Sequence, residues 1–178
     1  MNIPLVKLKA ILLYFGTFTE QRFLGKVKLM KLFYFLDFMH VKKFGSPVTY
    51  DNYIKLEHGP IPSAIKNMVD TAEDDVDNSV LSDTIKIEMA DGEGIHRIVA
   101  LRKFTENDKK YFTPTEINIL ETVVERFGSK NTKFIEDASH NEAPWKETSF
   151  MDSIPYWLAT HDNDCQVSRE EIELMLSI

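Results

Sequence analysis

Apolar residues recur every three or four positions over the first 45 residues, which is the spacing of one face of a helix. From Leu5 to Phe15 this pattern predicts a first helix that opens near Pro4 and stops at Gly16. A second helix is predicted from Lys26 to Lys43, closed by Gly45. Its apolar residues leave only a narrow polar strip, so we expect it to be the central, buried helix of the core.

The next stretch, residues 48–58, alternates weakly between apolar and polar residues and contains β-forming residues, which predicts a short strand or extended segment. Pro60 and Pro62 suit the entrance of a following helix, which we expect from Ser63 to about Thr71. The charged and polar stretch 73–83 is typical of an exposed loop.

Strict alternation of apolar and polar residues then begins at Ile85 and predicts a strand over residues 85–90. Residues 91–94 read Asp-Gly-Glu-Gly, a turn sequence, and residues 95–104 resume the strand pattern. Together these segments predict one antiparallel β-hairpin.

A strong helix start follows at Thr113. Thr113 as N-cap, Pro114 at the first helical position and Glu116 form a capping box. The apolar spacing after them predicts a helix that ends at Gly128.

Two shorter helices are predicted near the C-terminus. One begins at Ser129 and runs to about Ala138; the other starts at a capping box of Ser168 and Glu171 and ends at Leu176. The fold class predicted is α+β: a mainly helical single domain with a central buried helix and a small antiparallel β-hairpin.

The composition of the chain limits its expected size class, cellular compartment and partners. The chain has 178 residues, of which 43% are hydrophobic, enough for one domain with its own core. A single cysteine, Cys165, excludes a disulfide framework and indicates a reducing compartment. Lys7 and Lys9 interrupt the apolar N-terminus, and no apolar run is long enough to span a bilayer, so we expect a cytoplasmic protein without a membrane partner. The net charge of −7 argues against nucleic acid and favours a basic protein partner.

The polar residues do not form a recognisable cofactor or metal site. The five histidines show no metal-ligand spacing, and no glycine-rich phosphate loop occurs, so we expect neither a metal nor a cofactor. Residues 161–165, His-Asp-Asn-Asp-Cys, are interpreted as a polar loop before the last helix.

The stretch around Gly59 allows a catalytic or a structural interpretation. Glu57 and His58 are adjacent on an extended segment and point to opposite faces, so we interpret them as contacts rather than an acid–base pair. Gly59 supplies backbone freedom and Pro60 fixes φ, which favours a structural corner.

Residues 139–148, Ser-His-Asn-Glu-Ala-Pro-Trp-Lys-Glu-Thr, leave two interpretations open. Trp145 with its charged neighbours suits a protein-contact hot spot. It equally suits a packed tryptophan that tethers an irregular connection to the core, with His140 capping a helix end.

The order of four short motifs along the chain resembles that of a known family. A Lys-Leu-x-Lys-Leu-x-Tyr helix, a Gly-Pro corner, a helix ending in Phe-Gly and a His…Trp-Lys turn follow one another over residues 5–150. The positions are Lys28, Leu29, Lys31, Leu32, Tyr34, Gly59, Pro60, Phe127, Gly128, His140, Trp145 and Lys146. This arrangement resembles the Panacea, or SocA-like, antitoxin domain of bacterial and phage toxin–antitoxin systems. The chain departs from it before Gly59, where the family often has tryptophan and tyrosine. We therefore expect a Panacea domain over residues 1–150, and over residues 151–178 an extension whose last helix packs on that domain.

The resemblance implies an antitoxin that neutralises a cognate toxin by direct protein contact, alone or as an adaptor that delivers the toxin to a host protease. The toxin is expected from an adjacent gene. For the contact we expect Trp145, Lys146 and Glu142 first, with Tyr34 and His58 as second choices.

Two alternatives remain. A small hydrolase or transferase would bring His58, His140 and Glu142 or Asp37 into one cleft. A phage or mobile-element regulatory protein would bind a host factor instead of a toxin.

Overall fold

The computed structural model describes residues 4–89 and 96–177. Its helices (α), 3₁₀ helices (η) and strands (β) are, in chain order, α1 Leu5–Phe18, η1 Gln21–Phe23, α2 Lys26–Phe44, β1 Tyr53–Leu56, β2 Gly59–Pro62, α3 Ser63–Asp74, η2 Val76–Asn78, β3 Ile85–Met89, β4 His96–Ala100, η3 Glu106–Tyr111, α4 Pro114–Phe127, α5 Thr132–His140, α6 Ala143–Lys146, η4 Tyr156–His161 and α7 Arg169–Ser177. The described part of the chain is mainly helical with small antiparallel sheets, so the predicted α+β class is confirmed.

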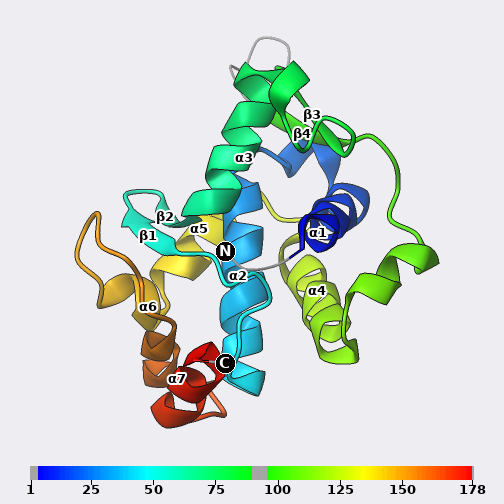
Figure 1. Ribbon diagram of the computed structural model, residues 1–178. Coiled ribbons are helices and arrows are strands. Elements are labelled where there is room, and N and C mark those ends of the chain that lie inside the picture. Colours follow the sequence, from blue (N-terminus) through cyan, green and yellow to red (C-terminus); the bar gives the residue numbers. More distant parts are fainter. Residues whose placement is uncertain (1–3, 90–95, 178) are drawn as a thin grey trace.

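The central position of α2 is also confirmed. Figure 1 shows α2 crossing the middle of the molecule, with α1 and α4 to one side and β1 and β2 to the other. Leu32, Phe33 and Leu36 on this helix have no exposed surface. The helix ends where the sequence predicts, because Gly45 adopts φ +79°, a left-handed conformation that glycine tolerates best.

Polar residues of α2 are buried as well, and they hydrogen-bond to residues outside the helix. The Lys28 ammonium donates to the carbonyl oxygens of Gly128 (3.0 Å) and Lys130 (2.6 Å). The Asp37 carboxylate accepts hydrogen bonds from the Thr49 amide at 2.7 Å and the Tyr53 hydroxyl at 2.8 Å. These contacts attach the segments that surround α2 to it, because a buried charged group needs hydrogen-bond partners.

Among the described residues, two hairpins are present where the sequence predicts one. The predicted hairpin is confirmed as β3 paired with β4, from Ile85 opposite Ala100 to Met89 opposite His96; its predicted turn, 91–94, lies outside the described residues. The second, β1 with β2, was missed, because Pro60 and Pro62 were assigned only to a helix entrance; Pro62 is indeed the N-cap of α3, which begins at Ser63 as predicted, but both prolines also pair with β1. A strand tolerates proline where it lies at the edge of a sheet, and β2 has β1 as its strand neighbour on one side.

Gly16 corrects the predicted end of the first helix. α1 continues past it to Phe18. A Cβ placed on Gly16 would lie 2.5 Å from the Cβ of Ala100, so this glycine lets α1 and β4 approach closely. Glycine is needed at position 16 because of packing against β4, and not because the helix ends there.

The other helix and loop boundaries differ less from the predicted ones. The capping box of α4 is confirmed, with the Glu116 amide donating to Thr113 Oγ1 at 3.3 Å. The N-cap of α5 is Asn131 rather than Ser129, since the Asn131 side chain accepts from the Phe134 amide at 3.0 Å. The stretch 73–83 is only partly a loop: α3 extends to Asp74 and η2 follows.

The segment after residue 150 is hydrogen-bonded to the earlier part of the chain. The Ile154 amide donates to the Tyr53 carbonyl at 2.7 Å, and the Gln166 amide donates to the Lys42 carbonyl at 2.8 Å. The Ser168–Glu171 capping box of α7 is confirmed. None of the described helices has both the length and the apolar content needed to cross a membrane.

Candidate functional site

Gly59 and Pro60 form a tight contact with α2. The buried Lys31 ammonium donates to the Pro60 carbonyl at 2.8 Å, and burial lowers the pKa of Lys31 to about 7. Gly59 has φ +99°, and a Cβ there would lie 2.7 Å from Lys31 Cε and 2.8 Å from Ser139 Oγ. Only glycine fits without a shift, so the structure supports the structural interpretation of this corner.

Trp145 ties α6 to the β1–β2 hairpin. Its ring stacks on His140, with centroids 4.0 Å apart and planes at 19°, and the Lys55 ammonium lies 4.2 Å from the ring centroid. Its indole N–H donates to the Leu56 carbonyl at 3.3 Å. The packing interpretation of Trp145 therefore has direct support, while the ring keeps some exposed surface. His140 stacks rather than caps, and burial lowers its pKa.

Glu142 faces inward. Its carboxylate accepts from the Tyr34 hydroxyl and from the Lys42 ammonium, both at 3.0 Å. Burial raises the pKa of Glu142, against the opposing effect of Lys42. Tyr34 has no exposed surface and its hydroxyl bonds to Glu142 inside the fold, so the structure does not offer it for the expected contact, which stays a prediction.

Lys42 is the centre of a charged cluster that the sequence did not reveal. Its ammonium lies 3.0 Å from carboxylate oxygens of Glu142, Asp162 and Asp164, and its side chain is only 4% exposed. Burial lowers the pKa of Lys42, but the three carboxylates more than offset this and raise it overall. The stretch 161–165, interpreted as a plain polar loop, thus holds α2 in place.

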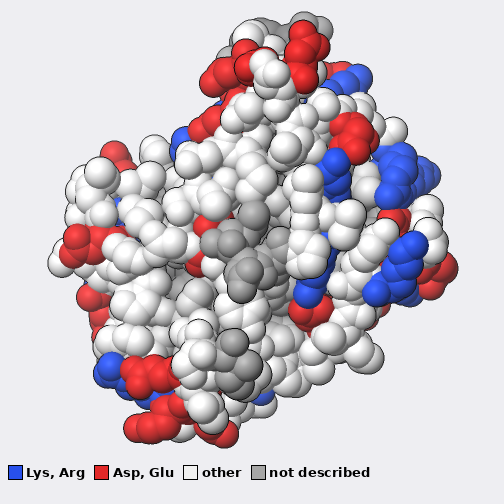
Figure 2. Space-filling view, viewed as in Figure 1, with Lys and Arg blue, Asp and Glu red and all other residues white. Residues whose placement is uncertain are grey.

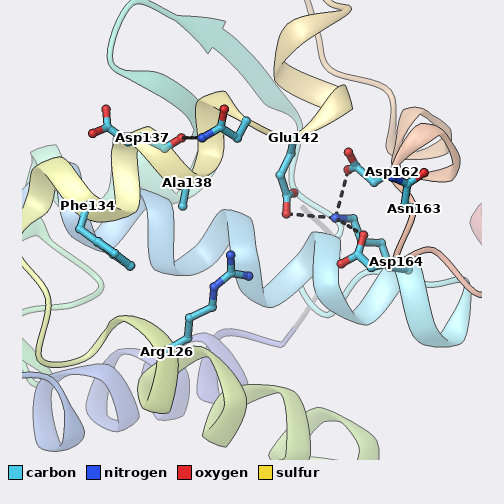
Figure 3. Close-up of a pocket in the computed structure, with 10 residues that line it drawn as sticks. Arg126, Phe134, Asp137, Ala138, Glu142, Asp162, Asn163 and Asp164 are labelled. Atoms are coloured by element: carbon cyan, nitrogen blue, oxygen red, sulfur yellow. Dashed lines mark hydrogen bonds and ion pairs between the residues drawn. The ribbon is translucent and has the colours of Figure 1, made fainter.

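This cluster forms one side of a cavity of about 510 Å³, which residues of α4 and α5 also line (Figure 3). Arg126 enters it from α4 and Phe134 from α5. The Arg126 guanidinium lies 4.8 Å from the Phe127 ring centroid and forms no ion pair with the described residues. The complete lining is Lys42, Arg126, Phe134, Asp137, Ala138, Asn141, Glu142, Asp162, Asn163 and Asp164.

The remaining predicted contacts gather at the opposite side of α5, where the hairpin turn meets α6. His58 occupies the turn between β1 and β2, exposed, with Nδ1 3.3 Å from a Glu136 carboxylate oxygen. Lys146 is exposed at the end of α6, directly after Trp145. Sequence reasoning missed two neighbours: Phe150 and Met151 are each 63% exposed.

A family model described as "Antitoxin SocA-like, Panacea domain" matches residues 29–146. The chain belongs to this family. The match extends from α2 to α6 and confirms the suspected resemblance; it places the protein in the context of toxin–antitoxin systems. Comparisons with curated proteins and with solved structures gave no match.

In this Panacea domain the four side chains of the hydrolase alternative do not converge. His58 approaches Glu136, Glu142 bonds to Tyr34 and Lys42, and His140 stacks on Trp145. Asp37 has no exposed surface and is enclosed among Thr49, Tyr53 and Tyr156. Within the described residues no hydrogen bond joins any two of the four, so they do not make a shared acid–base site.

Proposed function

We propose that this Panacea domain is an antitoxin that neutralises a cognate toxin by direct protein–protein contact. The family match carries the proposal, since it spans the elements that build the candidate site. The contact surface we propose is the exposed side of the hairpin turn and α6, here called the hairpin–α6 end. It comprises His58, Lys146 and the exposed edge of Trp145.

Two observations support this surface. The hairpin and α6 are fixed to each other through Trp145, and the hairpin is fixed to α2 through Lys31. A preformed surface loses less conformational entropy on binding than a mobile one. Glu142 contributes from beneath, because its carboxylate joins the start of α6 to Tyr34 and Lys42.

The partner we propose is a toxin encoded by an adjacent gene and present in the cytoplasm with the antitoxin. The net charge of −7 supports a basic protein surface as partner and disfavours nucleic acid. A role as adaptor for a host protease belongs to the same proposal, since it needs the same contact plus a second one.

The test is co-expression with the product of the neighbouring reading frame. Wild-type protein should restore growth and co-purify with that product, and Glu57→Lys combined with His58→Ala should weaken both effects, because the added positive charge repels a basic partner. Glu106→Lys is the matched control, because Glu106 is an exposed glutamate on η3, away from the hairpin–α6 end. A toxic neighbour that the wild-type protein neither binds nor neutralises would refute the proposal.

Two further measurements separate the finer alternatives. If the toxin's half-life shortens only when a host protease is present, the adaptor role is supported. If purification from host lysate instead yields a non-toxic protein encoded elsewhere, the regulatory alternative replaces the antitoxin proposal.

A further inference from the structure

Phe150 and Met151 are two consecutive large apolar side chains exposed to water. They lie on the segment that links α6 to η4, and each is 63% exposed. Contact of apolar surface with water is unfavourable, but a single exposed apolar residue is common. The adjacency of Phe150 and Met151 is therefore a first indication of a binding surface. The hydrogen bonding of the backbone that carries them is the second.

The segment that carries these side chains is fixed to the β1–β2 hairpin. The Met151 amide donates to the Lys55 carbonyl at 2.9 Å, and the Lys55 amide donates to the Asp152 carbonyl at 3.0 Å. The Lys55 ammonium also donates to the Thr148 carbonyl at 2.7 Å. In Figure 1 this segment runs beside the hairpin at the left of the molecule. The two apolar side chains thus project from an ordered platform.

Met151 adopts a backbone conformation that disfavours its own side chain. Its φ is +70°, in the left-handed region where glycine is favoured and a residue with a Cβ is strained. Glycine at this position would relieve the strain and remove exposed apolar surface. The folded protein therefore keeps a methionine here at a cost in stability, which is typical of positions that serve binding.

The surroundings of the pair are mainly acidic. Among the described residues, Glu57, Glu147 and Asp152 are exposed next to the pair on the hairpin turn, at the end of α6 and on the segment itself, together with the exposed Lys146 and the half-buried Lys55. Figure 2 shows red acidic side chains among uncharged atoms at this end, whereas Lys and Arg gather at the opposite side of the view. An apolar centre with a charged rim is the usual arrangement of a protein-binding surface.

We propose that Phe150 and Met151 are the apolar anchors of the toxin interface, and that the toxin receives them in an apolar pocket rimmed by Lys or Arg side chains. This inference rests on the proposed function and extends the hairpin–α6 end by two residues. Burial of two adjacent side chains from a rigid support gives affinity, and the acidic rim speeds association with a basic partner.

The decisive variant is Met151→Gly. It relieves the left-handed strain, so the melting temperature should rise or stay unchanged while the affinity for the product of the adjacent toxic gene falls about tenfold or more. Phe150→Ala should weaken binding similarly. Leu174→Ala is the matched control, because Leu174 is 62% exposed on α7, outside this surface, and its affinity should stay within about twofold of wild type.

The rim is tested by Asp152→Lys. Its association rate should fall several-fold at low ionic strength, and the difference from wild type should shrink at high salt. An association rate that is the same as wild type at both salt concentrations would refute the basic rim.

The outcomes separate the two levels of the argument. If wild-type protein neutralises the toxin and both anchor variants bind it as wild type does, the anchor inference is wrong and the antitoxin function stands. If wild-type protein binds no toxin, both fall. If sedimentation shows a wild-type dimer that Met151→Gly dissociates, the surface joins two copies of this chain and the toxin assignment is refuted.

Discussion

Gly59→Ala tests the corner that connects the hairpin to α2. The substitution has two costs. A side chain at φ +99° costs about 1–2 kcal/mol. The new Cβ would also lie 2.7 Å from Lys31 Cε and 2.8 Å from Ser139 Oγ, an overpacking that typically costs about 1–3 kcal/mol. We expect the free energy of unfolding to fall by about 2–5 kcal/mol in total.

Gly45→Ala isolates the first cost. Gly45 also has positive φ, +79°, but the nearest atom to an added Cβ is 3.5 Å away, an ordinary contact. It should lose only about 1–2 kcal/mol. Adding Ser139→Ala to Gly59→Ala removes one of the two close contacts and should recover part of the loss, which a double-mutant cycle measures.

The assay is urea unfolding followed by circular dichroism on wild type, Gly59→Ala, Gly45→Ala, Ser139→Ala and the Gly59→Ala/Ser139→Ala double variant. The cost of Gly59→Ala should exceed that of Gly45→Ala by at least about 1 kcal/mol. Equal losses at the two glycines, with no coupling to Ser139, would show that the close approach of Lys31 and Ser139 does not constrain this corner.

Three further predictions concern stability. Burial raises the pKa of Asp37 to about 6 against the hydrogen bonds from Thr49 and Tyr53, so the folded state retains a proton that the unfolded chain has released. Wild-type stability should therefore decrease as pH rises from about 4 to about 6, relative to Asp37→Asn; parallel melting curves for the two proteins across this range would contradict the shift. Trp145→Ala should lower the free energy of unfolding by about 2–3 kcal/mol, since the ring packs on His140 and donates to the hairpin, and a melt unchanged from wild type would show that its role is only at the surface. A chain ending at residue 150 should lose its cooperative thermal transition, because buried residues of η4 and α7 leave the core; a normal melt of the short chain would make residues 151–178 a dispensable extension.

Local sequence signals predicted the helices well. The Thr113–Glu116 capping box and the Gly45 stop both lie within a few residues of the end they define, so they can be read without the rest of the chain. The alternation that begins at Ile85 similarly identified β3 and its partner.

Two of the three missed features depend on residues distant in sequence; the third, the β1–β2 hairpin, is local. Gly16 was interpreted as a helix stop, but its requirement comes from Ala100 in another element. The β1–β2 hairpin was hidden by two prolines that an edge strand tolerates. The Lys42 cluster joins positions about 100 residues or more apart, and no periodicity or motif in one sequence encodes such a pairing.

The residues of the candidate site fall into two groups: those that hold the fold together and those that are exposed for binding. Lys31, Gly59 and Trp145 carried the family resemblance, and their contacts lie inside the fold. Lys31 donates to the Pro60 carbonyl, Gly59 packs closely on α2, and Trp145 stacks on His140. A residue whose polar atoms already have hydrogen-bond partners gains little from a new protein contact, because its existing hydrogen bonds must break before new ones form. Phe150 and Met151 have large exposed surfaces and lie beyond residue 146, where the family match ends. The exposed side chains at positions 150 and 151 can therefore be changed without loss of the contacts that Lys31, Gly59 and Trp145 make, so under the proposed function these two positions would set the choice of partner while the fold stays the same.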